Sequence, residues 1–196
     1  MTDVQTVLGR AASIVGQHTV YWAGSGGSDP RAASPVQPLA IGKQWPLQTP
    51  GDQAIFRPLA KAAGLYVDDP HLVAPACDCS GFVCWALGIS RHPTPETWIN
   101  TDTIWEDANG RGVQFRKIEQ AVVGCLVVYP KAGSNEKYGH IALVTEIDAH
   151  GRATHIVHCS ASNFSSAPPD AIKITGPEAF EAQSRSVYAW VHGMKA

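Results

Sequence analysis

Apolar side chains recur at helical spacing near the start of the chain. Between Asp3 and Gly16, intervals of three and four residues separate Val4, Val7, Leu8, Ala11, Ala12 and Val15. This spacing places them on one face and predicts an amphipathic helix that ends near Gly16. The same pattern, carried by Ile55 and Leu59, predicts another helix over 52–63.

The segment 78–88 carries the end signals of a helix as well as an apolar stripe. Asp78 is suited to the N-cap, and Gly88 stands where a C′ glycine belongs. Between them, an inward stripe is formed by Phe82, Val83, Ala86 and Leu87. Cys79 would therefore lie in the first turn of this helix. A further helix is predicted over 95–108.

Several later segments are rich in Val, Ile and Tyr, which is typical of strands. The predicted strands are 113–117, 125–129, 140–148, 154–159 and 186–192. Because helices come first and a run of neighbouring strands follows, we expect an α+β protein with helices packed on an antiparallel sheet.

Prolines concentrate in the segment that separates the first helix from the helix at 78–88. Eight of the fourteen prolines lie between residues 24 and 75, so regular structure there should be short and interrupted. We expect its aromatic residues Trp45, Phe56 and Tyr66 to be buried. The sequence therefore predicts a long, ordered, proline-rich insertion at about 28–75 within a single domain of residues 1–196.

The composition narrows the possible partners. Lys and Arg number 15 against 17 Asp and Glu, and a net charge of −2 disfavours nucleic acid or an anionic membrane as a partner. No apolar run is long enough to span a membrane, and the first ten residues lack the basic and apolar regions of a signal peptide. We therefore expect a soluble protein that is synthesised in the cytoplasm without a signal peptide.

Cys79 is the candidate nucleophile among five cysteines whose odd number favours reduced thiols. The first turn of a helix favours the thiolate, and the backbone N–H of Cys79 could donate to a developing oxyanion. Gly81 would leave room for a substrate beside it. The alternative is that Cys79 is a small buried apolar residue, which is the usual place of a free cysteine.

A cysteine nucleophile needs an imidazole base, and the base needs a partner on its other ring nitrogen. His140 opens the strand 140–148 and His158 lies near the end of the next strand. A hairpin through residues 148–151 would bring them side by side. His155 stands three residues before His158 and should point to the opposite face. No cofactor is expected for this chemistry.

Four segments, in this order, resemble the NlpC-type, papain-like cell-wall cysteine peptidases. They are Asp78-Cys-Ser-Gly-Phe-Val, Gly124-Cys-Leu-Val-Val-Tyr129, Gly139-His-Ile-Ala-Leu-Val-Thr-Glu146 and Ile156-Val-His-Cys-Ser160. By position, the resemblance implies a papain-like fold with Cys79 as nucleophile, His140 as base and His158 as the residue that orients it. It covers Tyr21 and about residues 77–160.

The same resemblance implies a substrate and residues that bind it. Tyr21, in Tyr21-Trp-Ala-Gly-Ser-Gly-Gly27, is similar to a tyrosine that lines the cleft in the family. Asp78 and Ser80 would help to hold the amino end of the peptide. The implied substrate is the peptide stem of bacterial peptidoglycan, cut between D-glutamate and diaminopimelate.

The run from Tyr138 to Ala142 is also similar to one in the type VI secreted amidases. This resemblance implies an antibacterial effector that reaches the periplasm by non-classical delivery. An effector of this kind would need an immunity protein, which we expect to plug the cleft.

Three other interpretations of the same residues stay open. Cys77, Cys79, His155, His158 and Cys159 are residue types that bind zinc, although their spacing suits a tetrahedral site poorly. A thioester intermediate resolved by another nucleophile would make the protein an acyltransferase or a deamidase of protein side chains. An inactive scaffold retained for binding is the third alternative.

Overall fold

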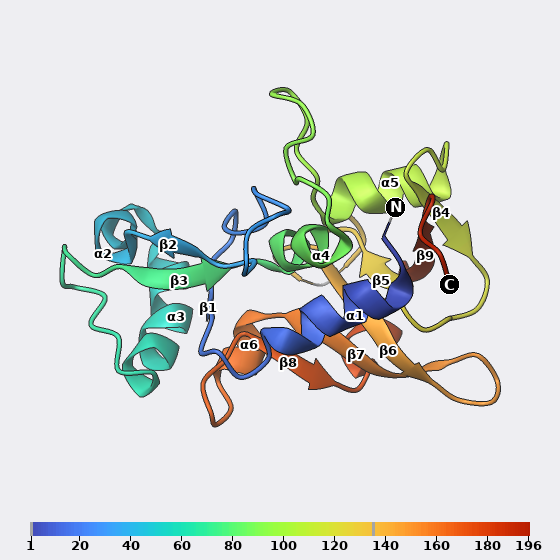
Figure 1. Cartoon of the computed structure of the whole chain (residues 1–196). Coiled ribbons are helices and arrows are strands. Elements are labelled where there is room, and N and C mark those ends of the chain that lie inside the picture. Colours follow the sequence, from blue (N-terminus) through green and yellow to red (C-terminus); the bar gives the residue numbers. More distant parts are fainter. Residues whose placement is uncertain (1, 135) are drawn as a thin grey trace.

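The computed structural model describes residues 2–134 and 136–196, which form a six-stranded antiparallel sheet with helices packed on it (Figure 1). The strands follow the order β4-β9-β5-β6-β7-β8. Their bounds are β4 Phe115–Ile118, β5 Leu126–Tyr129, β6 His140–Ile147, β7 Ala153–Cys159, β8 Ile172–Thr175 and β9 Val187–Val191. The predicted α+β class with an antiparallel sheet is confirmed.

The strands predicted from sequence are all present, and each end lies within two residues of its expected position. The pairing of β6 with β7 is the predicted hairpin, in which Leu143 faces Val157. Strand β8 was not predicted. It has only four residues, and two of its side chains are polar, so it lacks a run of apolar residues.

Helices α4 Cys79–Leu87 and α5 Thr101–Asn109 pack on this sheet, and α1 Val4–Ser13 packs on α4. Helix α4 lies between an N-cap at Asp78 and a left-handed Gly88, as predicted. The predicted start of the helix at 95–108 is wrong. Asn100 caps α5 through a capping box with Thr103, so the helix begins six residues later than expected.

The proline-rich insertion folds into short elements at one end of the molecule (Figure 1). They are β2 Gln37–Leu39, α2 Ile41–Gln44, the 3₁₀ helix η1 Trp45–Leu47 and α3 Pro50–Ala62. Trp45 is buried and Phe56 is half-buried, as expected. The expectation for Tyr66 is wrong: its side chain is 79% exposed, because it lies in the turn after α3, where its carbonyl accepts from the N–H of Asp69.

A second, three-stranded sheet joins the insertion to the rest of the chain. Strand β3 Ala74–Cys77 lies between β1 Val20–Tyr21 and β2, parallel to β1 and antiparallel to β2. This pairing places Tyr21 opposite Cys77, although about fifty residues separate them. Trp45 and Ile41 of the insertion share one buried apolar cluster with Ile141 of the main sheet.

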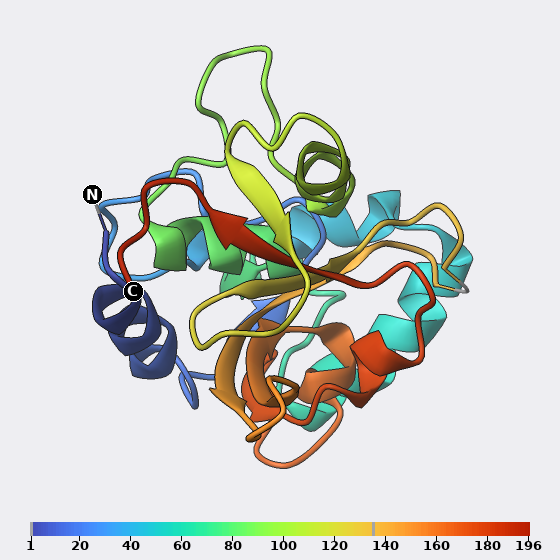
Figure 2. The same ribbon diagram turned by 90° about the vertical axis from the view of Figure 1, so that its right-hand side faces the viewer.

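The two ends of the chain lie side by side (Figure 1 and Figure 2). The N–H of Val4 donates to the carbonyl of Lys195, and the N–H of Lys195 donates to the carbonyl of Thr2. Two short helices, α6 Ala161–Phe164 and α7 Glu178–Glu181, follow β7 and β8. Both termini are thus held against the body of the fold.

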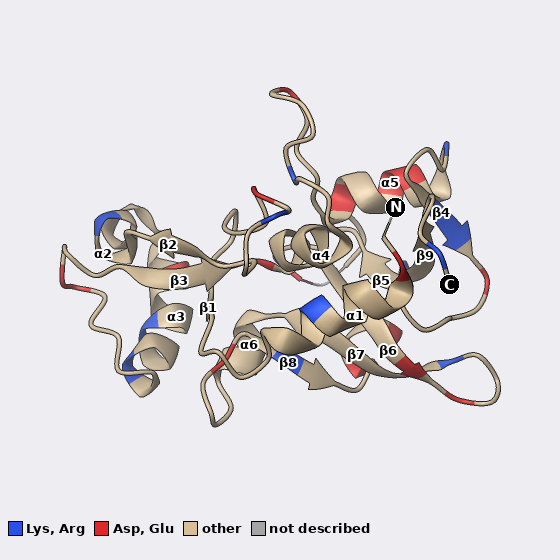
Figure 3. Ribbon diagram, in the orientation of Figure 1, with Lys and Arg blue, Asp and Glu red and all other residues tan. Residues whose placement is uncertain are grey.

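Acidic and basic residues lie close to each other on the elements at one end of the main sheet. Helix α5 is acidic, and the adjacent strand β4 is basic (Figure 3). Within the described ranges, no helix combines the length and the apolar character that a membrane-spanning segment needs.

Candidate active site

Helix α4 presents Cys79 as its first residue, directly after the N-cap. The carboxylate of Asp78 accepts hydrogen bonds from the N–H of Gly81 at 2.7 Å and from the hydroxyl of Ser80 at 3.1 Å. The N–H of Cys79 has no acceptor within the helix, because it belongs to the first turn. It is therefore placed to donate to an oxyanion that forms at the thiol.

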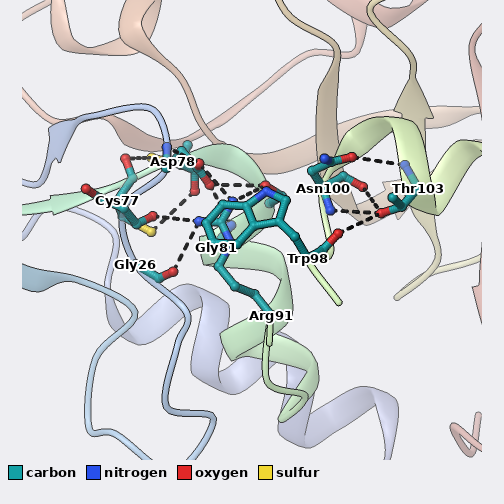
Figure 4. Close-up of polar contacts among 12 residues, drawn as sticks. Gly26, Cys77, Asp78, Gly81, Arg91, Trp98, Asn100 and Thr103 are labelled. Carbon is teal, nitrogen blue, oxygen red and sulfur yellow. Dashed lines mark hydrogen bonds and ion pairs between the residues drawn. The ribbon is translucent and has the colours of Figure 1, made fainter. Parts of the chain in front are cut away.

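A buried ion pair fixes this N-cap (Figure 4). Nη2 of Arg91 donates to the carboxylate of Asp78 at 2.9 Å and to the hydroxyl of Ser80 at 2.7 Å. Nη1 of Arg91 donates to the carbonyl of Ser25 at 3.0 Å, and the guanidinium lies 4.0 Å from the centre of the Trp98 ring. Arg91 therefore connects the start of α4 to the loop after β1 and to Trp98.

Gly81 allows the chain to pack closely on itself at this helix start. A Cβ atom at Gly81 would lie 2.6 Å from the carbonyl oxygen of Ser25 and 2.7 Å from that of Gly26. The expectation that Gly81 leaves room for a substrate is therefore wrong. The loop that follows β1 already fills the space.

His140 and His158 form a hydrogen-bonded pair from neighbouring strands, as the sequence predicts. Nε2 of His140 lies 2.7 Å from Nδ1 of His158. The other ring nitrogen of His158, Nε2, lies 3.0 Å from the hydroxyl oxygen of Thr175 on β8. His155 points away from this pair, and its Nδ1 lies 3.0 Å from the carboxylate of Glu146.

Aromatic side chains enclose the two imidazoles. The buried ring of Phe180 on α7 stacks on His140, with ring centres 5.2 Å apart and an angle of 20° between the planes. The ring of Tyr129, which is paired with His140 across β5 and β6, lies at 6.2 Å. Burial lowers the pKa of His158 to about 4. Burial and the neighbouring His158 lower the pKa of His140 to about 3.

Both histidines line a cavity of about 420 Å³. Tyr21 lines it as well. The insertion supplies part of the wall through Trp45, Gln48, Asp52, Ile55 and Phe56. The facing part belongs to the loop before β6, where the ammonium group of Lys137 forms an ion pair with Asp52 of the insertion.

Cys79 is buried, with 5% exposure, and is not one of the residues that line this cavity. Two phenols, Tyr21 and Tyr129, do line it. Burial raises the pKa of Tyr21 above its usual range, and the nearby Cys79 raises it further. The same two causes, together with Glu136, raise the pKa of Tyr129 to about 12. The helix that begins at Cys79 packs on β6 and β7, the strands that carry the histidine pair.

Burial changes the expected charge of Cys79. It raises the pKa of the Cys79 thiol above its ordinary value, and the carboxylate of Asp78 raises it further, whereas Arg91 acts in the opposite direction. The first helical turn, which favours the thiolate, is therefore opposed by desolvation, which favours the neutral thiol.

Asp78 and Ser80 are placed differently from Tyr21. Both are buried, and their polar atoms form hydrogen bonds with Arg91 and with the backbone at the start of α4.

Two residues that support the site, Arg91 and Phe180, were not predicted from the sequence. Arg91 follows the helix by only a few residues, yet nothing in the local pattern marks it as the partner of a buried carboxylate.

Zinc is one interpretation of the cysteine and histidine pattern. Among residues 2–134 and 136–196, no three His, Cys, Asp or Glu side chains are grouped to hold a metal ion. His155 is directed away from His158, which separates two of the expected ligands. The zinc interpretation is therefore not supported.

Comparison with known proteins gives one match. Residues 71–162 match the family model of the CHAP domain, and this segment contains Cys79, His140 and His158 but not Tyr21. No curated protein and no solved structure matches the chain. The segment 71–162 is therefore similar to the CHAP domains, a family of cysteine amidase and peptidase domains that is related to the NlpC/P60 peptidases.

Proposed function

We propose that the protein hydrolyses the peptide stem of bacterial peptidoglycan, with Cys79 as nucleophile, His140 as base and His158 as the residue that orients the base. The observation that carries this proposal is the 2.7 Å contact between His140 and His158 in the wall of the cavity, on the strands against which the helix of Cys79 packs. The CHAP match supports amidase or peptidase chemistry on peptidoglycan in general.

A papain-like fold belongs to the same proposal. It is supported by the thiol at the start of a helix, and by the two histidines on adjacent antiparallel strands against which that helix packs. Tyr21 is proposed to contact the peptide, since it lines the cavity. Asp78 and Ser80 are buried, which favours an indirect role for them: they hold the start of α4 in place and do not contact most of the substrate.

Because burial favours the neutral thiol, the proposed reaction begins with a proton transfer. Nδ1 of His140 takes the proton of Cys79 as the sulfur attacks the carbonyl carbon of the scissile amide. The N–H of Cys79 stabilises the resulting oxyanion. His140 then gives the proton to the departing amine, which leaves a thioester on Cys79. Water, deprotonated by His140, attacks the thioester and releases a carboxylate and the thiol.

The scissile bond is proposed to be the one between D-glutamate and diaminopimelate. Digestion of purified Gram-negative peptidoglycan tests this, because the masses of the released fragments identify the new ends. We expect wild type to release fragments and Cys79→Ala to release none. Cys84→Ala, which removes another buried thiol from the same helix, should cleave like wild type.

Two results would contradict the proposal. Cleavage by Cys79→Ala would exclude Cys79 as the nucleophile. If wild type leaves peptidoglycan intact but iodoacetamide still modifies Cys79 selectively, the substrate is not the cell wall. An acyltransferase or a deamidase of protein side chains then becomes the better interpretation.

The proposed partners and location follow from the substrate. We propose that the protein acts in the periplasm or the cell wall and reaches it by a non-classical route. If the protein is an antibacterial effector, a cleft-plugging immunity protein is its expected partner. Co-expression of the product of a neighbouring gene tests this, since an immunity protein should abolish the cleavage of peptidoglycan in vitro.

A further inference from the structure

Thr175 lies next to the histidine pair. It lies outside α4, β6 and β7, the three elements that carry the proposed catalytic residues. It is the last residue of β8, the edge strand beside β7. His158 is paired with Lys173 across these strands, so Thr175, two residues further along, lies on the same face as His158. The hydroxyl oxygen of Thr175 lies 3.0 Å from Nε2 of His158.

The direction of this hydrogen bond follows from the other partner of the hydroxyl. Thr175 donates its single hydroxyl proton to the carbonyl oxygen of Gly176 at 2.9 Å. A carbonyl oxygen can only accept, so towards His158 the hydroxyl presents a lone pair. Only one assignment makes both contacts hydrogen bonds: the hydroxyl of Thr175 donates to Gly176, and Nε2–H of His158 donates to the hydroxyl oxygen.

The proton on His158 determines the proton on His140. A neutral imidazole carries one N–H, so Nδ1 of His158 is unprotonated and accepts a hydrogen bond from Nε2–H of His140. Both imidazoles are neutral near pH 7, because burial lowers the pKa of His140 to about 3 and that of His158 to about 4. Nδ1 of His140 is left with a free lone pair.

We propose that Thr175 is a positioning residue of this active site, whose hydroxyl fixes the tautomers of His158 and His140 so that Nδ1 of His140 can accept the proton of Cys79. The inference rests on the proposed function, since it assigns that proton transfer to His140. The chain of hydrogen bonds runs through β8, β7 and β6, one residue from each strand.

The opposite tautomers would block the reaction. If Nδ1 of His158 carried the proton, it would donate to Nε2 of His140. The single proton of His140 would then reside on Nδ1, where it prevents this nitrogen from accepting the proton of the thiol. Without the hydroxyl of Thr175, the N–H at Nε2 of His158 has no acceptor at this position, so the active tautomer loses its advantage.

The test compares Thr175→Val, which keeps the branched shape and loses the hydroxyl, with Thr175→Ser, which keeps the hydroxyl. Ile174→Val is the control, because it changes an exposed side chain on the same strand. Histidine ¹⁵N–¹H long-range spectra of the full chain report which ring nitrogens carry protons. We expect His158 to be the Nε2–H tautomer in wild type, Thr175→Ser and Ile174→Val, and to be a mixture in Thr175→Val.

Kinetics supply a second readout. With peptidoglycan, we expect Thr175→Val to lower kcat by about 10- to 100-fold with little change in KM, by analogy with lost outer partners of metal-ligating histidines. Thr175→Ser should restore kcat to within a few-fold of wild type. Alkylation of Cys79 by iodoacetamide, which needs no substrate, should be slowed by Thr175→Val alone.

These readouts separate the inference from the proposed function. If wild type does not cleave peptidoglycan, the proposed function is wrong, and the tautomers and the alkylation rates still test Thr175. An Nδ1–H tautomer of His158 in wild type would overturn the inference even if Thr175→Val fails to fold. So would a Thr175→Val variant whose tautomers and alkylation rate match those of wild type.

Discussion

The carboxylate of Asp78 and the guanidinium of Arg91 form an ion pair at 2.9 Å in which both side chains are almost completely buried. The carboxylate also caps α4 and accepts from the N–H of Gly24 at 2.7 Å. One charged pair thus joins the start of the nucleophile helix to the loop after β1 and to the segment after α4. Its integrity determines where Cys79 lies.

Arg91→Met is expected to lower the free energy of unfolding by about 3–5 kcal/mol, the cost of removing one partner from a buried ion pair. The remaining carboxylate of Asp78 would be buried without its countercharge, which disfavours the folded state. Urea denaturation at pH 7 measures this change. Arg152→Met, which removes an exposed arginine from its ion pair with Asp148, should leave the midpoint nearly unchanged. Equal effects of the two substitutions would contradict this account.

Gly81→Ala should destabilise the fold, because the added methyl group would meet two backbone carbonyl oxygens at 2.6 and 2.7 Å. We expect a loss of about 1–3 kcal/mol in the free energy of unfolding, typical of overpacking. Gly9→Ala is the matched control on α1, since its Cβ would meet nothing within 4 Å. That substitution should stabilise the protein by about 0.5–1 kcal/mol through helix propensity. A stable, fully active Gly81→Ala variant would show that the loop after β1 can move away from α4.

The elements that carry the proposed chemistry were predictable because their signals are local. Asp78 and Gly88 mark the two ends of α4, and alternation along β6 and β7 places His140 and His158 on one face. Within the insertion, the helix predicted over 52–63 is confirmed as α3, whereas β2, α2 and η1 were not predictable, and neither was β8. Each of these four has only three or four residues, and its stability comes from neighbours that are distant in the sequence, as in the pairing of β2 with β3.

The contacts that support the site could not be predicted from the sequence either, because they also depend on residues that are distant in the sequence. Arg91 and Phe180 act through tertiary packing, and neither stands in a motif with the residue that it supports. The protonation of Cys79 was also beyond the sequence pattern. A first-turn position predicts a favoured thiolate, but the degree of burial, which reverses that preference, depends on the side chains that cover the cavity.

The stability of the fold should fall between about pH 6.5 and pH 5 because of His158. Burial holds its pKa at about 4 in the folded state, below the 6.5 of the unfolded chain. In this interval the unfolded chain binds a proton and the folded chain does not, so acidification favours unfolding. For one histidine, the loss over this interval is about 1–2 kcal/mol. His140, whose pKa is also lowered, adds to the same trend.

Urea denaturation of wild type and His158→Asn at pH 6.5 and pH 5 measures this contribution. The variant should lose less stability on acidification, because one of the two buried imidazoles is gone. His150→Asn, at an exposed position in the β6–β7 turn, should lose as much stability as wild type. An identical pH dependence in wild type and His158→Asn would mean that His158 protonates freely in the folded protein.

The ion pair between Asp52 and Lys137 connects α3 of the insertion to the loop before β6, and both residues line the cavity. Since only 5% of Cys79 is exposed, a peptide must displace some of the side chains around this cavity before the thiol can attack it. A bridge between two of its walls opposes such a displacement. Exposed ion pairs are weak, so the bridge should set how often the cavity opens and should contribute little to the stability of the fold.

Lys137→Gln should therefore speed the alkylation of Cys79 by iodoacetamide severalfold and leave the urea midpoint nearly unchanged. Lys131→Gln removes a positive charge from the same loop without breaking the bridge, so its alkylation rate should match that of wild type. High salt provides an independent check, because at about 1 M ionic strength the screening length falls to about 3 Å. Wild type should then react as fast as Lys137→Gln, and the variant itself should respond little to salt. If neither Lys137→Gln nor high salt changes the rate of alkylation, other contacts keep the cavity closed over Cys79.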